Sequence, residues 1–188
     1  INIDFSGYEY NDFKKLKPVS LNHHNEKKIK LPEILDENFA EWLGLIYGDG
    51  NVTEKRYASY VGIQIGLDDK DMIEKYKKLS KELFGVHVYE NKRKDKPDNS
   101  ISLRIASKPL IRFLRENDCL KTSSTKLFVP LLIKESPSSV RAAFLRGFFE
   151  SDGTVEKRMY RSCSSVSERM IKDVQSLLQS LGILSKSF

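Results

Sequence analysis

Two stretches of the chain, WLGLIYGDG at residues 42–50 and LRGFFESDG at residues 145–153, follow one pattern. Each carries a small residue at its third and seventh positions, two large apolar residues between them, and Asp-Gly at its end. A glycine that follows a helix commonly supplies the left-handed residue that ends it, so each stretch predicts the C-terminal end of a helix. The two predicted helices end at Asp49 and Asp152.

The residues before the end of each stretch are spaced as on helices. Asp36 is the expected N-cap of the first helix, and Ser138 or Ser139 of the second, because these side chains accept hydrogen bonds from a first helical turn. Apolar residues then recur at the spacing of a helix face. They are Phe39, Trp42, Leu43, Ile46 and Tyr47 in the first helix, and Ala142, Phe144, Leu145, Phe148 and Phe149 in the second.

A similar order of elements follows each predicted helix. Residues 52–66 predict a β-hairpin and residues 68–84 a helix closed by Gly85. After the second stretch, residues 154–166 predict a strand pair and residues 167–181 a helix closed by Gly182. The first copy continues with a second hairpin, at residues 86–91 and 100–106, and a helix at residues 107–117. Such an internal repeat indicates two structurally similar halves within one chain.

The repeat predicts an α+β fold with two pseudo-symmetric halves of order αββαββα, packed through the two motif helices and presenting a saddle of β-hairpins. We expect an extended lead-in at residues 1–32, a candidate remnant of a neighbouring domain, and the first half at residues 33–120. Residues 121–188 are expected to hold a linker and the second half. We expect this half to be incomplete, because no second hairpin or third helix is visible in its sequence.

The small residues in each motif provide a physical explanation for the pattern. In each copy they lie four positions apart, on one helix face, where they allow two helix backbones to approach closely. Close approach would bring Asp49 and Asp152 together at the negative ends of two helix dipoles, where two carboxylates favour a shared cation. Mg²⁺ suits oxygen ligands of this kind. The residues expected to form this helix contact are Gly44, Gly48, Gly147 and Ser151.

On these two motifs, and on the elements that follow each, the chain resembles the LAGLIDADG homing endonucleases over residues 33–188. The segment from Lys126 through the second motif is most similar to intein-type endonuclease domains. The resemblance implies a monomer with pseudo-twofold symmetry that hydrolyses both strands of double-stranded DNA at a long recognition site. It implies Mg²⁺ or Mn²⁺ as cofactor, held by the catalytic pair Asp49 and Asp152, with Gly48 and Ser151 as further metal contacts.

A lysine is the next candidate for the active site. The resemblance implies a catalytic role for Lys126, because intein-type members carry a lysine shortly before a proline here, in this chain Pro130. Its cation would polarise the attacking water or the phosphate. Lys121 is a weaker alternative, and an ordinary surface lysine is the other interpretation of Lys126. Gln64, late in the first hairpin, is a candidate contact for the water or the DNA backbone.

The predicted hairpins supply the candidates for DNA binding, because a two-stranded ribbon fits the major groove and its alternate residues reach base edges. Alternation places Thr53, Lys55, Tyr57 and Ser59 on one face of the first hairpin, unless a bulge intervenes. Cations at the loop tip would contact phosphates, which adds affinity rather than specificity. The full set of candidates is Thr53, Lys55, Arg56, Tyr57, Gln64, Lys92, Arg93, Lys94, Arg104, Arg158, Tyr160 and Arg161.

The composition agrees with a nucleic-acid partner. Lys and Arg number 32 against 26 Asp and Glu, which gives a net charge of +6 and a pI near 9.2. Cations set against phosphates release condensed counterions, so a basic excess favours a polyanionic partner. Two separated cysteines, Cys119 and Cys163, suggest a reducing intracellular compartment, cytoplasmic or nucleoid-associated. Residues 127–133, the longest apolar stretch, are too few to span a bilayer, so no membrane partner is expected.

Other functions share this fold. The main alternative to an endonuclease is a non-cleaving nucleic-acid-binding regulator or an intron maturase, and a nicking or inactive form is a third interpretation. The presence of both Asp49 and Asp152 favours cleavage, because a binder has no need of a matched acidic pair.

Overall fold

The computed structural model describes residues 12–20, 29–92, 99–121, 123–155 and 161–186, with the backbone alone for residues 152–155 and 161. The first half contains α1 (Glu37–Asp49), β1 (Gly50–Lys55), β2 (Ala58–Gly66), α2 (Lys70–Phe84), β3 (Tyr89–Asn91), β4 (Ser100–Ile105) and α3 (Lys108–Glu116). A linker with η1 (Ser124–Lys126) and α4 (Leu131–Lys134) leads to the second half. That half contains α5 (Ser138–Asp152), β5 (Gly153–Val155), β6 (Arg161–Cys163) and α6 (Glu168–Ser180). The predicted α+β order is confirmed.

The boundaries of the first motif helix follow from local chemistry. The Asp36 carboxylate accepts a hydrogen bond from the Phe39 amide at 2.8 Å, which is the predicted N-cap of α1. The prediction that Gly50 is left-handed is wrong, because its φ is −78° and the chain enters β1 directly. The glycine is required there for space, since a Cβ would lie 2.3 Å from the Ile46 carbonyl oxygen. Gly85, at the end of α2, has the left-handed φ of 62°.

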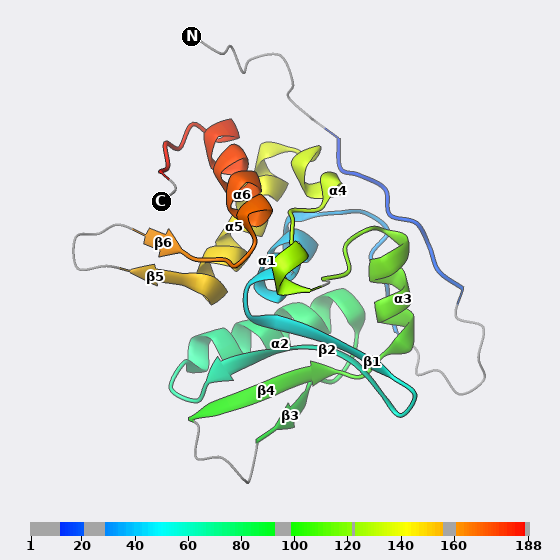
Figure 1. Cartoon of the computed structure of the whole chain (residues 1–188). Helices are drawn as coiled ribbons and strands as arrows, with labels where there is room; N and C mark the ends of the chain where they lie inside the picture. The colour runs from blue at the N-terminus through cyan, green and yellow to red at the C-terminus, as the bar shows by residue number, and fades with distance from the viewer. Residues whose placement is uncertain (1–11, 21–28, 93–98, 122, 156–160, 187–188) are drawn as a thin grey trace.

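The two motif helices cross at their glycines. A Cβ on Gly44 would lie 2.2 Å from the carbonyl oxygen of Phe144, and a Cβ on Gly147 would lie 2.1 Å from that of Glu41. Such distances exclude any side chain larger than hydrogen unless a backbone moves. Figure 1 shows α1 and α5 side by side in the middle of the molecule. The predicted packing of the two halves through these helices is confirmed.

Aromatic and aliphatic side chains fill the space around this helix pair. Phe39 and Trp42 of α1 are fully buried and pack against Phe84 and Phe113, with the Trp42 and Phe84 ring centroids 4.8 Å apart. Burial of large aromatic side chains is among the strongest contributions to a protein core. The core of the first half therefore holds α1 in a fixed position relative to its sheet.

The first half forms one antiparallel sheet of strand order β1-β2-β4-β3. Alternation along β2 buries Val61, Ile63 and Ile65 on one face. Figure 1 shows α2 lying along the sheet, and an ion pair of 2.8 Å between Lys77 of α2 and Glu90 of β3 joins the two. The opposite face carries polar side chains, so the sheet presents a hydrophilic surface beside the end of α1.

The second half places β5 and β6 in a two-stranded antiparallel sheet after α5 and packs α6 against α5, with Met170, Val174 and Leu177 buried. The linker is held to α6, because Asp173 accepts hydrogen bonds from the Val129 amide at 3.0 Å and from Lys134. No helix in the part of the chain that the structure describes has the length and apolar character to cross a membrane.

The lead-in is joined to the first half. Leu16 is buried, and its amide donates to the Glu33 carbonyl at 2.8 Å. Lys17 and Asn117 hold each other through two hydrogen bonds, in which the Lys17 amide donates to the Asn117 side chain at 2.7 Å and the Asn117 side chain donates to the Lys17 carbonyl at 3.1 Å. Residues 14–17 thus fasten the end of α3 to the segment that precedes α1.

Candidate metal and nucleic-acid site

The site is built where α1 meets the polar face of the sheet. Asp49, the last residue of α1, is exposed and lines two adjacent hollows, of about 170 and 100 Å³. The backbone of Asp152 ends α5, and its side chain lies outside the described residues. Ser151 Oγ turns back on its own helix and donates to the Gly147 and Phe148 carbonyls at 3.2 and 3.1 Å. Of the two predicted acids, Asp49 is therefore the one whose side chain the structure describes.

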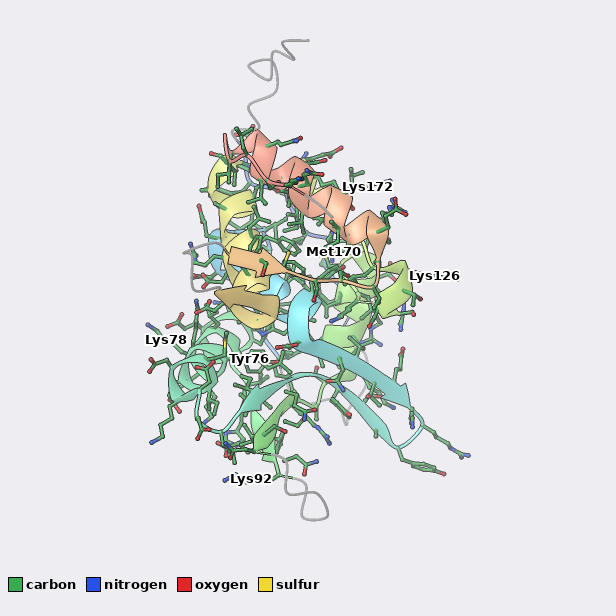
Figure 2. All side chains as sticks on the ribbon, turned by 60° about the vertical axis from the view of Figure 1, so that its left-hand side comes forward. Tyr76, Lys78, Lys92, Lys126, Met170 and Lys172 are labelled. Carbon is green, nitrogen blue, oxygen red and sulfur yellow. The ribbon has the colours of Figure 1, made fainter. Side chains whose placement is uncertain are left out.

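Lys121 contacts the end of α1. Its Nζ donates to the Gly48 carbonyl oxygen at 2.5 Å, which places a cation at the negative end of the helix dipole and one residue from Asp49. Lys126 lies exposed in η1 (Figure 2). Of the two predicted lysines, Lys121 is the one for which the described structure records contact with a motif helix. The resemblance to intein-type members, which carry a lysine shortly before a proline, implied Lys126 instead.

The register of the sheet defines which predicted DNA contacts share a face. Lys55 pairs directly with Ala58 across the two-residue turn at Arg56 and Tyr57, and Thr53 pairs with Tyr60. Residues that pair directly point to the same side of a sheet. The prediction that Ser59 shares the face of Thr53 is therefore wrong, because alternation was counted through the turn. Tyr57 is 88% exposed at the hairpin tip, beside Arg56.

The larger hollow lies on this polar face, next to Asp49. Arg104 of β4 is its basic residue and Asp49 its acidic one, and the other side chains are neutral and polar. Predicted residues in the hollow are Asp49, Gln64 and Arg104. Prediction missed Asn51, Tyr60, Asn91, Ser100 and Ser102, although the period of two along each strand, once a register is known, places all of them on this face.

Hydrogen bonds order the side chains of the larger hollow. Gln64 Nε2 donates to Ser100 Oγ at 2.7 Å, and the Arg104 Nε donates to Ser102 Oγ at 2.9 Å. A hydrogen bond with Thr53 lowers the pKa of Tyr60 despite partial burial, and the Arg104 cation, 4.5 Å from the ring centroid, acts in the same direction. The polar groups are thus held by one another before any ligand is present.

The remaining predicted DNA contacts fall at the edges of the described structure. Lys92 is exposed directly after β3 (Figure 2). Arg161 belongs to β6, but its side chain lies outside the described residues. Arg93, Lys94, Arg158 and Tyr160 also lie outside them.

An ionic network fixes the motif helices beside the smaller hollow. Glu41 of α1 is buried and pairs with Lys75 of α2 and Arg146 of α5, and Lys75 also pairs with Glu150 of α5. Burial raises the pKa of Glu41, but the hydrogen bonds from Arg146 and Lys75 outweigh it, so that the pKa lies below its ordinary value of 4.5. Three helices therefore share one buried carboxylate.

This network predicts a pH dependence of stability. Because the pKa of Glu41 is lowered in the folded state, its contribution is full above pH 4.5 and is lost as the pH falls through the lowered value. We expect Glu41→Gln to cost about 1.5–3 kcal/mol at pH 7, the usual worth of hydrogen bonds to a charged group. The difference in thermal midpoint between the two proteins should shrink as the pH falls below 4.5. A difference that stays constant with pH would contradict this assignment.

Comparison with known proteins identifies the fold family. The model of the LAGLIDADG-like domain family matches residues 36–117 and 139–188, which include both motifs. A structure from a study of mesophilic variants of the homing endonuclease I-DmoI is similar, with a TM-score of 0.58 at 21% identity over 81% of this chain and 80% of that chain. A second structure, of I-DmoI in complex with DNA and Ca, gives the same TM-score and identity over 81% and 75%. At this identity the structures show the shared fold.

The proteins that are similar in sequence are much longer than this chain, which matches one segment of each. The chain is 28% identical to a replicative DNA helicase DnaB of Synechocystis sp. over 91% of its own length and 21% of the helicase. It is 32% identical to one subunit of the A-type ATP synthase of Pyrococcus horikoshii over 73% of the chain and 13% of that relative. It is 31% identical to a DNA polymerase of Thermococcus hydrothermalis over 79% of the chain and 9% of the polymerase. The chain thus spans about a fifth or less of these relatives. By its motifs, its fold and the family match over both repeats, the chain belongs to the LAGLIDADG family and has the fold of a homing endonuclease.

Proposed function

We propose that this chain is a site-specific double-strand DNA endonuclease that acts as a monomer and uses Mg²⁺ or Mn²⁺ held by Asp49 and Asp152. The observation that carries the proposal is the crossing of α1 and α5 at Gly44 and Gly147, which packs the two motif helices of one chain against each other. Each helix ends in an aspartate, so one molecule supplies two acids that would share the cation used on both strands of a duplex.

The residues present fit a divalent cation. Asp49 is exposed at the negative end of α1, and the motif pattern supplies oxygen donors that hard cations prefer. A bound cation would lower the pKa of a water and stabilise the leaving oxygen of a phosphodiester. Asp49 and Asp152 would hold it, and the polar face of the sheet would orient the duplex above it.

Lys121 has a separate role in this proposal. Its ammonium group is fixed by the Gly48 carbonyl, which precedes by one residue the aspartate that would hold the metal. A cation fixed there favours negative charge that develops on a scissile phosphate. Lys121 is therefore proposed as the catalytic lysine in place of Lys126.

The three relatives support an independent module. Their names denote a helicase, part of an ATP synthase, and a DNA polymerase, and the matched part is 21%, 13% and 9% of each. A segment common to proteins with such different activities is not what gives any of them its named activity. We propose that this segment is an intein-type endonuclease domain, in a reducing intracellular setting that suits a buried Cys119 thiol.

The proposal is tested with a plasmid library of randomised inserts. We expect the chain to linearise a subset of plasmids in Mg²⁺ or Mn²⁺, none in EDTA, and the linear products to share one long sequence at their ends. Sequence-selective binding by folded protein without cleavage in either metal would contradict the proposal and favour a non-cleaving regulator.

The two lysines are compared on the selected site. Lys121→Met should lower the single-turnover cleavage rate by about 100-fold, the scale for one positioned donor to a developing charge. Its effect on the DNA dissociation constant should stay within about threefold, because the cation acts on the transition state. Lys126→Met is the matched comparison, at an exposed lysine of η1. A loss of rate in Lys126→Met, with Lys121→Met active, would reverse the assignment.

A further inference from the structure

Arg104 occupies a space that the sheet prepares for it. It pairs across β4 and β2 with Gly62, where a Cβ would lie 3.2 Å from the Arg104 Cγ. The absence of a side chain at Gly62 lets the aliphatic part of Arg104 lie across the strand. Its guanidinium carbon then sits 4.5 Å from the centroid of the Tyr60 ring, within the range of a cation–π contact.

Three contacts fix the orientation of the guanidinium group. Ser102 Oγ accepts from Nε at 2.9 Å, and the Tyr60 ring supports one face. With the Asn91 amide turned so that its oxygen faces Arg104, that oxygen accepts from both terminal nitrogens, at 2.8 and 3.3 Å. Asn91 is exposed on the edge strand β3. The two terminal N–H groups of Arg104 therefore point toward the Asn91 oxygen. Rotation of the Asn91 amide would move this oxygen away and let another acceptor take its place.

We infer that Arg104 recognises a guanine in the major groove, close to the phosphate on which the metal held by Asp49 would act. This inference rests on the proposed function, which identifies the ligand as duplex DNA. Arginine only donates, and its fork requires two neighbouring acceptors. Guanine presents O6 and N7 as such a pair, whereas adenine adds a donor, cytosine presents a donor, and thymine offers one oxygen beside a methyl group.

The neighbours of Arg104 do not select one base over the others in this way. Gln64, Asn51 and Ser100 each donate and accept, so they adapt to several base edges. Of the described residues that line the hollow, Arg104 is the basic one, and Asp49 lines the same hollow. The guanine is therefore expected within the half-site bound by the first half, beside the cleavage position.

The test uses binding selections in EDTA, which do not depend on cleavage. The wild-type chain and its variants are each incubated with a randomised DNA library, and the bound DNA is sequenced. We expect one guanine position near the centre of the wild-type site, with a preference of about 10- to 100-fold. Arg104→Lys keeps the charge and loses the planar fork, and because an ammonium group can still contact O6 and N7, this preference should fall a few-fold while other positions stay unchanged.

A second variant separates recognition from a structural role. Glutamine pairs with the N6 and N7 atoms of adenine, so Arg104→Gln should move the preference at that position from guanine toward adenine. Arg115→Lys is the matched control, because Arg115 pairs with Glu54 and does not line the hollow. It should leave the base preference at every position unchanged.

The outcomes distinguish this inference from the proposed function. An unchanged guanine preference in both Arg104 variants, in a chain that cleaves its site, would overturn the inference and leave the endonuclease in place. An Arg104-dependent guanine position in a chain that never cleaves would support the inference and contradict the endonuclease.

Discussion

Asp49→Asn should reduce cleavage of both strands by about a thousandfold or more, because a metal bound to a reacting phosphate supplies several kcal/mol of transition-state stabilisation. The amide keeps the size of the side chain and removes its charge. Divalent cations such as Mg²⁺ are bound through one or two carboxylates, so loss of one charge removes much of the site. Binding to the selected duplex in EDTA should change by less than about tenfold, since no metal takes part.

The control for this substitution is Asp71→Asn. Asp71 is exposed in the first turn of α2 and is not among the residues that line either hollow, so its carboxylate is not part of the proposed metal site. Single-turnover rates of the two variants on the same duplex provide the comparison. If the cleavage rate of Asp49→Asn were within tenfold of that of Asp71→Asn, Asp49 would have no role in the reaction.

Gly44→Ala should lower the stability of the chain by about 3 kcal/mol, the upper part of the usual range for overpacked sites. The new Cβ would lie 2.2 Å from the Phe144 carbonyl oxygen and 2.7 Å from the Phe148 nitrogen. Both atoms are backbone, so relief requires one motif helix to move away from the other. For a chain of this size the thermal midpoint should fall by roughly 6–12 °C.

The effect should repeat on the facing helix. A Cβ on Gly147 meets the Glu41 carbonyl oxygen at 2.1 Å, so Gly147→Ala should cost a similar amount. Gly66→Ala is the matched control, because the nearest atom to its Cβ is the Asn99 oxygen at 3.9 Å. Equal thermal midpoints for Gly44→Ala and Gly66→Ala would show that the helix crossing is looser than the structure places it.

Sequence patterns predicted the elements that depend on local chemistry. The N-cap at Asp36, the glycine that closes α2 at Gly85 and the pattern of each motif are each encoded within a few neighbouring residues. The close crossing at Gly44 and Gly147 followed from small residues at a four-residue spacing. These features fix the fold and the position of Asp49.

The rest depends on pairings between distant residues. Tyr60 faces Thr53 because the turn holds two residues, and a count by alternation alone placed Ser59 there instead. Lys121 reaches the Gly48 carbonyl across 73 positions of sequence, which no spacing rule encodes. Leu16 of the lead-in is buried although its surroundings have no periodic pattern. Tertiary contacts decide all three placements.

We propose that the ends of α1 and α5 hold one divalent cation between Asp49 and Asp152. The most direct measurement is anomalous scattering from Mn²⁺ in crystals of the chain bound to its selected duplex. A cation shared by the two carboxylates would give a manganese peak within about 2.5 Å of a carboxylate oxygen of both residues, next to a backbone phosphate. Manganese bound elsewhere, with the duplex seated on the sheet and no peak between the two carboxylates, would contradict it.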